Sequence, residues 1–322
     1  MSSDDRDPVQ AAYEGEDDLY DVATWDARTG LDAVAVLVHT TLRAAKSWVL
    51  ILLAGALFFA ELIFVGLLVI DTPLIGLLSI LSVIPALLLA AYLWYGDPTR
   101  REPLDTMAVT FLLSVLFASF AAVVNSSLLP AFELLPAVGL PLFFFLVVGP
   151  IEETVKWLAI RVHAYRSDSF RTVVDGVVYG AIAGLGFAAI ENVFYIVDAF
   201  LMTAQAGGPQ IQRTVQTATA RAFVGPGHVI YSAFAGYYLG LARYNPKQRG
   251  PIVVKGLLVA VAIHALYNTL VSAFQFPGLA FVLFVVVYDG IWLAILFRKV
   301  ARYRRYYQRA QAGLTADEAG PE

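Results

Sequence analysis

Charged side chains interrupt a long apolar stretch of this sequence at residues 137–160. The stretch contains Glu152, Glu153 and Lys156. A charged side chain at the centre of a bilayer costs roughly 2.5–3.5 kcal/mol on insertion scales, so its presence there points to a function. On a helix, Glu152 and Lys156 are four residues apart and can neutralise each other. Glu153 is rotated by about 100° from that face, so one lysine does not account for both acids.

Polar residues also interrupt three later apolar stretches. His228 and His264 lie deep within two of them, and Asn268 follows His264 by one helical turn. The stretch that precedes His228 carries Glu191 and Asn192. Acids, imidazoles and amides on consecutive stretches would meet if these stretches pack together in one bundle.

Such a set of side chains supports hydrolysis. A carboxylate beside histidines can activate water and protonate a leaving amine, and amide or imidazole N–H groups can stabilise an oxyanion. His228, His264 and Glu152 could also hold Zn²⁺ with an open position for water. The sequence has no cysteine, so thiolate ligands and a cysteine nucleophile are excluded. It also lacks a His-Glu-x-x-His motif, and both metal-dependent and glutamate-dependent activation of water remain open.

The elements that must position these residues are membrane-spanning helices. The chain is 59% hydrophobic and 15% charged, which is more apolar and less charged than soluble domains are. Each apolar stretch is long enough to cross a bilayer, and backbone groups in lipid must pair within the segment, which favours helices. We therefore predict an all-α, polytopic bundle of about eight spans, at residues 47–70, 73–95, 107–129, 137–160, 173–197, 220–242, 253–273 and 277–297.

The distribution of Lys and Arg predicts the orientation. These residues concentrate in alternate loops, which places both termini in the cytoplasm by the positive-inside rule. Residues 1–46 then form an acidic cytoplasmic tail, 47–297 the transmembrane domain, and 298–322 a basic and then polar cytoplasmic tail. We expect a long polar outer loop at 198–219. The expected location is the plasma membrane, with the lipid bilayer as a partner and no binding to nucleic acid.

Small residues recur every four positions in the fifth predicted span. Gly176, Gly180, Gly184 and Ala188 form one stripe on the helix, and such a stripe lets another helix approach closely. Glu191 lies near this stripe, so we expect it to face the interior of the bundle rather than lipid.

Four ordered motifs carry a resemblance to a known family: Glu152-Glu153-x-x-Lys156, Phe187-x-x-x-Glu191-Asn192, the in-span His228, and His264-x-x-x-Asn268. Together they resemble the PrsW family of intramembrane proteases, which is related to the type II CAAX prenyl endopeptidases and the CPBP group. The loop Asp97-x-x-Arg100-Arg101-Glu102-Pro103 also resembles the family's segment between early spans. The resemblance covers residues 92–273. In the CAAX relatives the second motif ends in His, whereas this chain has Glu191-Asn192.

The resemblance implies an endopeptidase that cleaves membrane-anchored proteins, with anti-sigma factors as the substrate type. It also implies that Glu152, Glu153 and His228 are essential. The family is classed as metalloproteases, while its CAAX relatives resemble metal-independent glutamate proteases, so Zn²⁺ on His228, His264 and Glu152 is one of two expectations.

We assign roles to these residues as a hypothesis. Glu152 or Glu153 activates water, and His228 and His264 polarise the substrate or donate a proton. Lys156 is expected to be a charge partner of the acids. Asn268 and Asn192 are expected to orient groups or to donate to the oxyanion. Glu191 either belongs to the site or forms a bridge to Arg221.

Two other functions stay open at this point. A non-catalytic membrane scaffold or chaperone would use the buried polar groups to fix helix packing, but it has little need of two adjacent acids. A proton-coupled transporter would use the acids as a relay, but such folds usually have repeated halves, which this sequence lacks. Glu61 and Asp289, in the first and last predicted spans, are expected to form hydrogen bonds inside the bundle.

Overall fold

The computed structural model describes residues 7–12, 15, 17–42, 56, 59–60, 63, 66–97, 99 and 101–318. Regular structure in these residues is helical, and the only β-type pairing there is an isolated bridge between Tyr20 and Thr24. The predicted all-α class is thus confirmed. The predicted span 47–70 lies largely outside the described residues, and so does Glu61.

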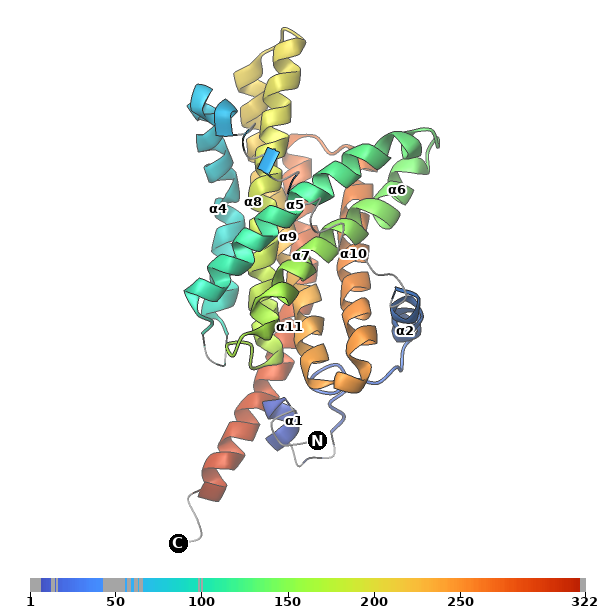
Figure 1. Cartoon of the computed structure of the whole chain (residues 1–322), viewed down its shortest axis with the longest axis vertical. Helices are drawn as coiled ribbons and strands as arrows, with labels where there is room; N and C mark the ends of the chain where they lie inside the picture. The colour runs from blue at the N-terminus through green and yellow to red at the C-terminus, as the bar shows by residue number, and fades with distance from the viewer. Residues whose placement is uncertain are drawn as a thin grey trace.

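Five helices among the described residues are long and apolar enough to cross a membrane. They are α4 (Pro73–Tyr95), α5 (Leu104–Glu133), α8 (Val173–Gln205), α10 (Arg249–Phe274) and α11 (Gly278–Glu318). The two other predicted spans correspond to α9 (Gln210–Tyr244) and to a composite segment of α6 (Gly139–Phe143), η2 (Phe144–Val148) and α7 (Gly149–Val162). The composite segment contains Glu152, Glu153 and Lys156, and α9 contains Arg221 and His228. Figure 1 shows α8, α9 and α10 in the middle of the bundle, with α5 crossing it obliquely.

The predicted outer loop at 198–219 is wrong in extent. Helix α8 continues to Gln205 and α9 begins at Gln210, so the connection is a turn of four residues, 206–209. Gln and Thr side chains make the segment polar without stopping a helix, and the chain turns only where Gly207 adopts a positive φ of 67° ahead of Gly208 and Pro209. The tip of this α8–α9 hairpin projects beyond the other helices in Figure 1. A helix of 33 residues is about 50 Å long, which exceeds a hydrocarbon core of about 30 Å.

Helices α8 and α9 pack with their backbones in contact. A Cβ atom built on Gly180 would lie 2.3 Å from the carbonyl oxygen of Ser232, and one on Gly184 would lie 2.2 Å from that of His228. The reciprocal glycine on α9, Gly236, would meet the carbonyl of Gly176 at 1.9 Å. The small-residue stripe therefore sets the distance between α8, which carries Glu191, and α9, which carries His228.

A π-helical turn precedes the paired acids. The predicted span 137–160 is helical from Gly139 to Val162, but Phe144–Val148 forms a π-helix rather than an α-helix. Pro150 lies directly after this turn and has no N–H to donate to the preceding turn, which interrupts the α-helical ladder. Turns of this type are frequent at functional sites. Here the π-helical turn leads directly into α7 (Gly149–Val162), whose fourth and fifth residues are Glu152 and Glu153.

The N-terminal segment is folded against one end of the bundle. Helix α1 (Pro8–Ala12) packs against α11 and helix α2 (Gly30–Leu42) against α10, as the two views show. Val9 and Trp25 are buried in the same core cluster as the bundle helices. Helix α11 itself runs past residue 297 to Glu318, so the basic segment predicted as a tail continues the last helix.

Asp7 anchors this segment inside the protein. Its carboxylate is fully buried and accepts hydrogen bonds from the Tyr303 hydroxyl at 2.9 and 3.1 Å and from the backbone N–H of Val9 at 2.9 Å. Burial raises the pKa of Asp7 to about 7, against the lowering effect of these hydrogen bonds, and the nearby Asp175 carboxylate contributes to the rise. The docked segment therefore favours a protonated Asp7.

Candidate active site

The two acids of α7 are buried, with Glu152 in its first turn and Glu153 directly after it. Glu152 is 3% exposed and Glu153 is fully buried. Lys156 Nζ lies 2.7 Å from Glu153 Oε1 and 3.8 Å from Glu152 Oε2. The predicted pairing of Lys156 with Glu152 is present, but the expectation that one lysine does not account for both acids is corrected, because Glu153 also pairs with Lys156 and at the shorter distance. Residues three apart are also neighbours on a helix. Glu152 Oε2 has no hydrogen-bond partner among the described residues.

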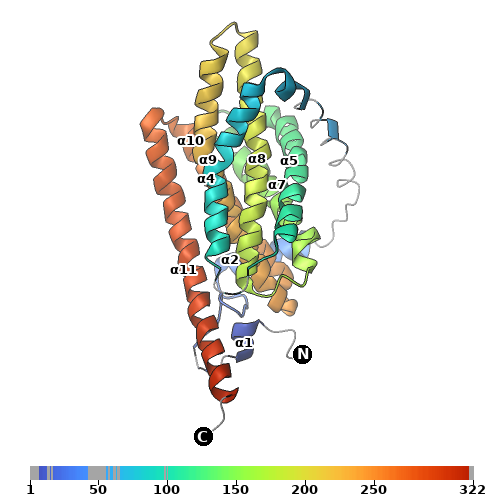
Figure 2. The same cartoon turned by 90° about the vertical axis from the view of Figure 1, so that its left-hand side faces the viewer.

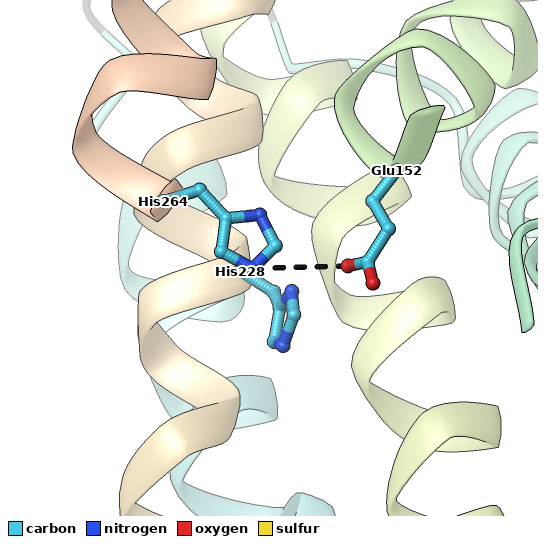
Figure 3. Close-up of side chains that lie close together, drawn as sticks. All are labelled: Glu152, His228 and His264. Carbon is cyan, nitrogen blue, oxygen red and sulfur yellow. Dashed lines mark ion pairs between the residues drawn. The ribbon is translucent and has the colours of Figure 1, made fainter. Parts of the chain in front are cut away.

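His264, from α10, faces both acids. Its Nδ1 lies 2.8 Å from Glu153 Oε1 and its Nε2 lies 3.8 Å from Glu152 Oε2. Figure 3 shows the His264 imidazole pointing toward the Glu152 carboxylate across the space between α10 and α7. The ring centroids of His264 and His228 are 5.2 Å apart. Side chains from α7, α9 and α10 thus meet in one cluster.

His228, from α9, is held on both ring nitrogens. Its Nδ1 lies 2.9 Å from Lys156 Nζ, and its Nε2 lies 2.9 Å from Glu191 Oε2. Lysine can only donate, so this geometry favours an unprotonated Nδ1 and an Nε2–H that donates to Glu191. The Lys156 ammonium also lies 4.2 Å from the centre of the Phe187 ring. A continuous polar chain therefore joins Glu153, Lys156, His228 and Glu191.

Glu191 both belongs to the site and bridges to Arg221. Besides its contact with His228, it accepts a charge-assisted hydrogen bond from the Arg221 guanidinium. Asn192 lies behind this pair, where it accepts a hydrogen bond from Arg221 Nε at 2.8 Å and donates to Ser82 Oγ at 3.0 Å. The two interpretations left open for Glu191 are thus present together, and Asn192 orients Arg221 rather than facing the two histidines.

A cavity of about 1130 Å³ opens beside this cluster. Glu152, Glu191, Arg221, His228, His264 and Asn268 are among the side chains that line it. Glu153, Lys156 and Asn192 are not. The cavity therefore divides the eight residues singled out from the sequence into a group that lines it and a group that does not.

Two residues of this neighbourhood were missed by the sequence analysis as site residues. Asn125, on α5, donates a hydrogen bond to Glu152 Oε1 at 3.0 Å. It is the only asparagine in the predicted span 107–129, and that isolated amide was the available signal. Arg221 is buried, with an exposure of 9%. Its signal was an arginine on the side of the predicted membrane that is otherwise nearly free of basic residues.

Comparison with known proteins decides the family. The profile of the "PrsW family intramembrane metalloprotease" family matches residues 102–295. The protease PrsW of Geobacillus kaustophilus is 30% identical over 232 residues, which cover 72% of this chain and 93% of that protein. The chain belongs to the PrsW family. Protease PrsW of Bacillus subtilis is 28% identical over 196 residues, covering 60% of this chain and 81% of the relative. No solved structure matches the chain.

Membership of the PrsW family makes this chain an intramembrane protease and a multi-pass membrane protein. The expected enzyme class and the expected resemblance are confirmed. The family profile begins at residue 102, so the docked N-terminal segment, residues 7–42, lies outside the part that matches it.

The residues of the cluster fit a metal ion, as the PrsW description implies. Glu152, His228 and His264 each offer one ligand atom, and these three atoms lie within 4.8 Å of one another. Two histidines and one carboxylate form a common ligand set of catalytic zinc. Glu153 contacts Nδ1 of His264 and leaves Nε2 free to bind a metal. Carboxylates commonly orient metal-binding histidines in this way. To bind a metal, His228 would give up its contact with either Lys156 or Glu191.

Proposed function

We propose that this PrsW-family protease cleaves its substrate at the cavity between α5, α7, α8, α9 and α10, with Glu152 as the carboxylate that accepts a proton from the attacking water. The observation that carries this proposal is Glu152 Oε2, which is buried at the cavity wall, accepts no hydrogen bond from the described residues and lies 3.8 Å from both His264 Nε2 and Lys156 Nζ. An unpaired buried carboxylate oxygen is costly. A scaffold that used the cluster only for packing would gain nothing by leaving it free.

Glu153 and Lys156 position the groups that react. Glu153 is fully buried and its Oε1 contacts both His264 and Lys156. It therefore fixes the orientation of the His264 ring, while Lys156 fixes that of His228 through Nδ1. We assign water activation to Glu152 rather than Glu153, because only Glu152 lines the cavity.

Proton delivery and oxyanion stabilisation fall to residues on the cavity wall. His228 Nε2, held by Glu191, and His264 Nε2 are the two imidazole atoms placed to hand a proton to the leaving amine. Asn268 lines the cavity and makes no hydrogen bond to the acids or imidazoles among the described residues, so its amide is available to an oxyanion. Asn192 is engaged by Arg221 and Ser82 and does not take that role.

If the enzyme is metal-dependent, Glu152, His228 and His264 would hold a divalent metal such as Zn²⁺ instead of carrying out the proton transfers described above, and the metal would supply Lewis-acid polarisation and acidification of water. The positioning roles of Glu153 and Lys156 are the same with or without it.

The walls of the cavity favour a membrane-anchored protein as the substrate. One side is apolar and includes Leu129, Leu140 and Phe143, while the side toward the α8–α9 hairpin includes Asp198 and Arg213. A segment that leaves the bilayer presents the same change from apolar to polar. Within this class, the family resemblance points to anti-sigma-factor-type substrates, with the plasma membrane as the location.

The test is cleavage of a membrane-anchored reporter by the purified chain in liposomes. Glu152→Gln should abolish cleavage. The matched control is Glu133→Gln, the same substitution at an exposed position of α5, which should leave the rate unchanged. A chelator added to the wild type, followed by Zn²⁺, measures metal dependence separately. Cleavage by Glu152→Gln at the rate of the wild type would end this assignment.

A further inference from the structure

A second group of acids lies at the N-terminal end of α8, whereas Glu191 lies near the middle of this helix. Asp97 is in the connection between α4 and α5, Glu102 lies just before α5 begins, and Asp175 is in the first turn of α8. Each offers one carboxylate oxygen, and these three atoms lie within 4.8 Å of one another. Sixteen residues of α8 separate Asp175 from Glu191, which corresponds to about 24 Å along the helix. The group is therefore distinct from the active site.

Asp175 is occupied by helix capping. With Thr172 it forms a capping box, in which its carboxylate accepts hydrogen bonds from the Thr172 hydroxyl and from the backbone N–H groups of Arg171 and Thr172. Asp97 Oδ1 accepts hydrogen bonds from the backbone and hydroxyl of Thr99 at 2.6 and 2.7 Å. These contacts fix where both carboxylates point.

The buried side chain of Glu102 points to a bound ligand. Its side chain is 2% exposed, and neither of its carboxylate oxygens has a hydrogen-bond partner among the described residues. Asp97 Oδ2 is in the same situation. No ion pair within the described part of the chain joins Asp97, Glu102 or Asp175 to a basic side chain. Buried charges are normally paired or bound to a metal.

We propose that Asp97, Glu102 and Asp175 form a binding site for a hard divalent cation. The ligand atoms are all oxygens, which suit Ca²⁺ or Mg²⁺ better than a softer metal. Ca²⁺ binds oxygen at about 2.3–2.6 Å and can therefore bridge oxygens about 4.6–5.2 Å apart, whereas Mg²⁺ at about 2.1 Å spans less. The three oxygens all lie within 4.8 Å of one another, and Ca²⁺ is the better match because it tolerates an irregular arrangement of ligands, whereas Mg²⁺ demands a near-ideal octahedron.

A bound cation would join the α4–α5 connection to the start of α8. It would satisfy oxygens of Glu102 and Asp97 that otherwise lack a donor among the described residues, and it would offset the repulsion between the three acids. Without a cation, a proton is the alternative: burial, together with the Asp97 and Asp175 carboxylates, raises the pKa of Glu102 to about 10. The cation and the shared proton make opposite predictions for substitutions at Glu102.

The indole of Trp94 provides a local probe, because its Nε1 donates to the backbone carbonyl of Glu102 at 3.3 Å. Tb³⁺, a luminescent substitute for Ca²⁺, should therefore give a saturable signal when tryptophan is excited in the purified full-length chain. Ca²⁺ should displace it at lower concentration than Mg²⁺. Trp94→Phe should remove this signal while leaving the three ligands in place, which separates it from Tb³⁺ bound at the active site.

Substitution of the ligands decides the question. Glu102→Gln and Asp97→Asn should weaken Tb³⁺ and Ca²⁺ binding at least about tenfold. Even substitutions of residues that only hydrogen-bond to a metal ligand lower metal affinity about 10–100-fold. Both should remove the rise in melting temperature that Ca²⁺ gives the wild type. Asp105→Asn, which removes an exposed acid three residues from Glu102, should bind as the wild type does.

Three results would overturn the proposal. The first is a wild-type chain whose luminescence and melting temperature do not respond to any of these cations. The second is an unchanged affinity in Glu102→Gln. The third is a Glu102→Gln variant that is more stable than the wild type at every cation concentration, which would show a carboxyl pair that shares a proton. None of these readouts depends on proteolysis, so the result is independent of the active-site assignment.

Discussion

Replacing Lys156 by methionine should destabilise the protein strongly, because the lysine is the cation of the buried acids on α7. The Lys156 side chain is fully buried, with its Nζ 2.7 Å from Glu153 Oε1 and 3.8 Å from Glu152 Oε2. At an effective dielectric constant of about 20, the closer contact corresponds to roughly 6 kcal/mol of Coulomb attraction before desolvation. Experiments on other proteins show that removing one partner of a buried pair costs about 3–5 kcal/mol.

We therefore expect Lys156→Met to lose about 3–5 kcal/mol of stability, measured as the shift of the unfolding transition in detergent. A second substitution, Glu153→Gln, should recover most of the loss, because it removes the carboxylate that the first one leaves unpaired. Lys247→Met, at an exposed position in the connection between α9 and α10, is the matched control. A Lys156→Met variant as stable as this control would refute the reasoning.

Two further predictions follow from the packing of α8 and from the docked N-terminal segment. Gly184→Ala should reduce both the yield of folded protein and its activity, because the new Cβ would lie 2.2 Å from a carbonyl oxygen of α9, while Gly290→Ala, which meets nothing within 4 Å, should fold and cleave normally. Burial raises the pKa of Asp7 to about 7 in the docked segment, from 3.8 in the free segment. The docked state therefore binds a proton more tightly than the free state does. The contribution of Asp7 to the stability of docking is complete below about pH 4 and is lost as the pH rises through 7. Limited proteolysis of the segment should therefore be faster at pH 8.5 than at pH 6, and Asp7→Asn should abolish that difference; cleavage at equal rates at the two pH values in the wild type would contradict the assignment.

The sequence predicted the elements of the bundle better than their lengths. Apolar stretches of about 20 residues identified α4, α5 and α10 closely, since lipid demands such stretches. It did not predict that α8 continues to Gln205 or that α9 already begins at Gln210. Polar residues without glycine or proline are compatible with both a loop and a helix. The four-residue spacing of Gly176, Gly180 and Gly184 did predict the close approach of another helix to α8, and the structure shows that this helix is α9.

The candidate site was predictable as a set of residues but not as an arrangement. Buried charge is rare enough in a membrane to single out Glu152, Glu153 and His228 from one sequence. Which acid lies closer to Lys156 depends on side-chain positions after the π-helical turn, and helical spacing alone predicted the pair with Glu152 but not the closer pair with Glu153. Asn125 was missed because a single amide on a span carries little signal until its partner, Glu152, is known.

The folded N-terminal segment was also beyond the sequence argument. Its acidic composition predicts a solvated tail, yet Lys255 on α10 lies 2.8 Å from Asp32 and 3.2 Å from Asp21. Those contacts join residues more than 200 positions apart. No local pattern of charge or hydropathy identifies such partners, so the docking of residues 7–42 appears only in the folded chain.

The central claim is that an acid from α7 and an imidazole from α10 act as one hydrolytic unit in a cavity within the membrane. The most direct test compares the cleavage rates of Glu152→Gln, His264→Ala and the double variant on one reconstituted substrate. Residues that act as a unit have strongly non-additive effects, so the double variant should be no slower than the slower single variant. Losses that multiply would show that the two side chains contribute independently and would contradict the account.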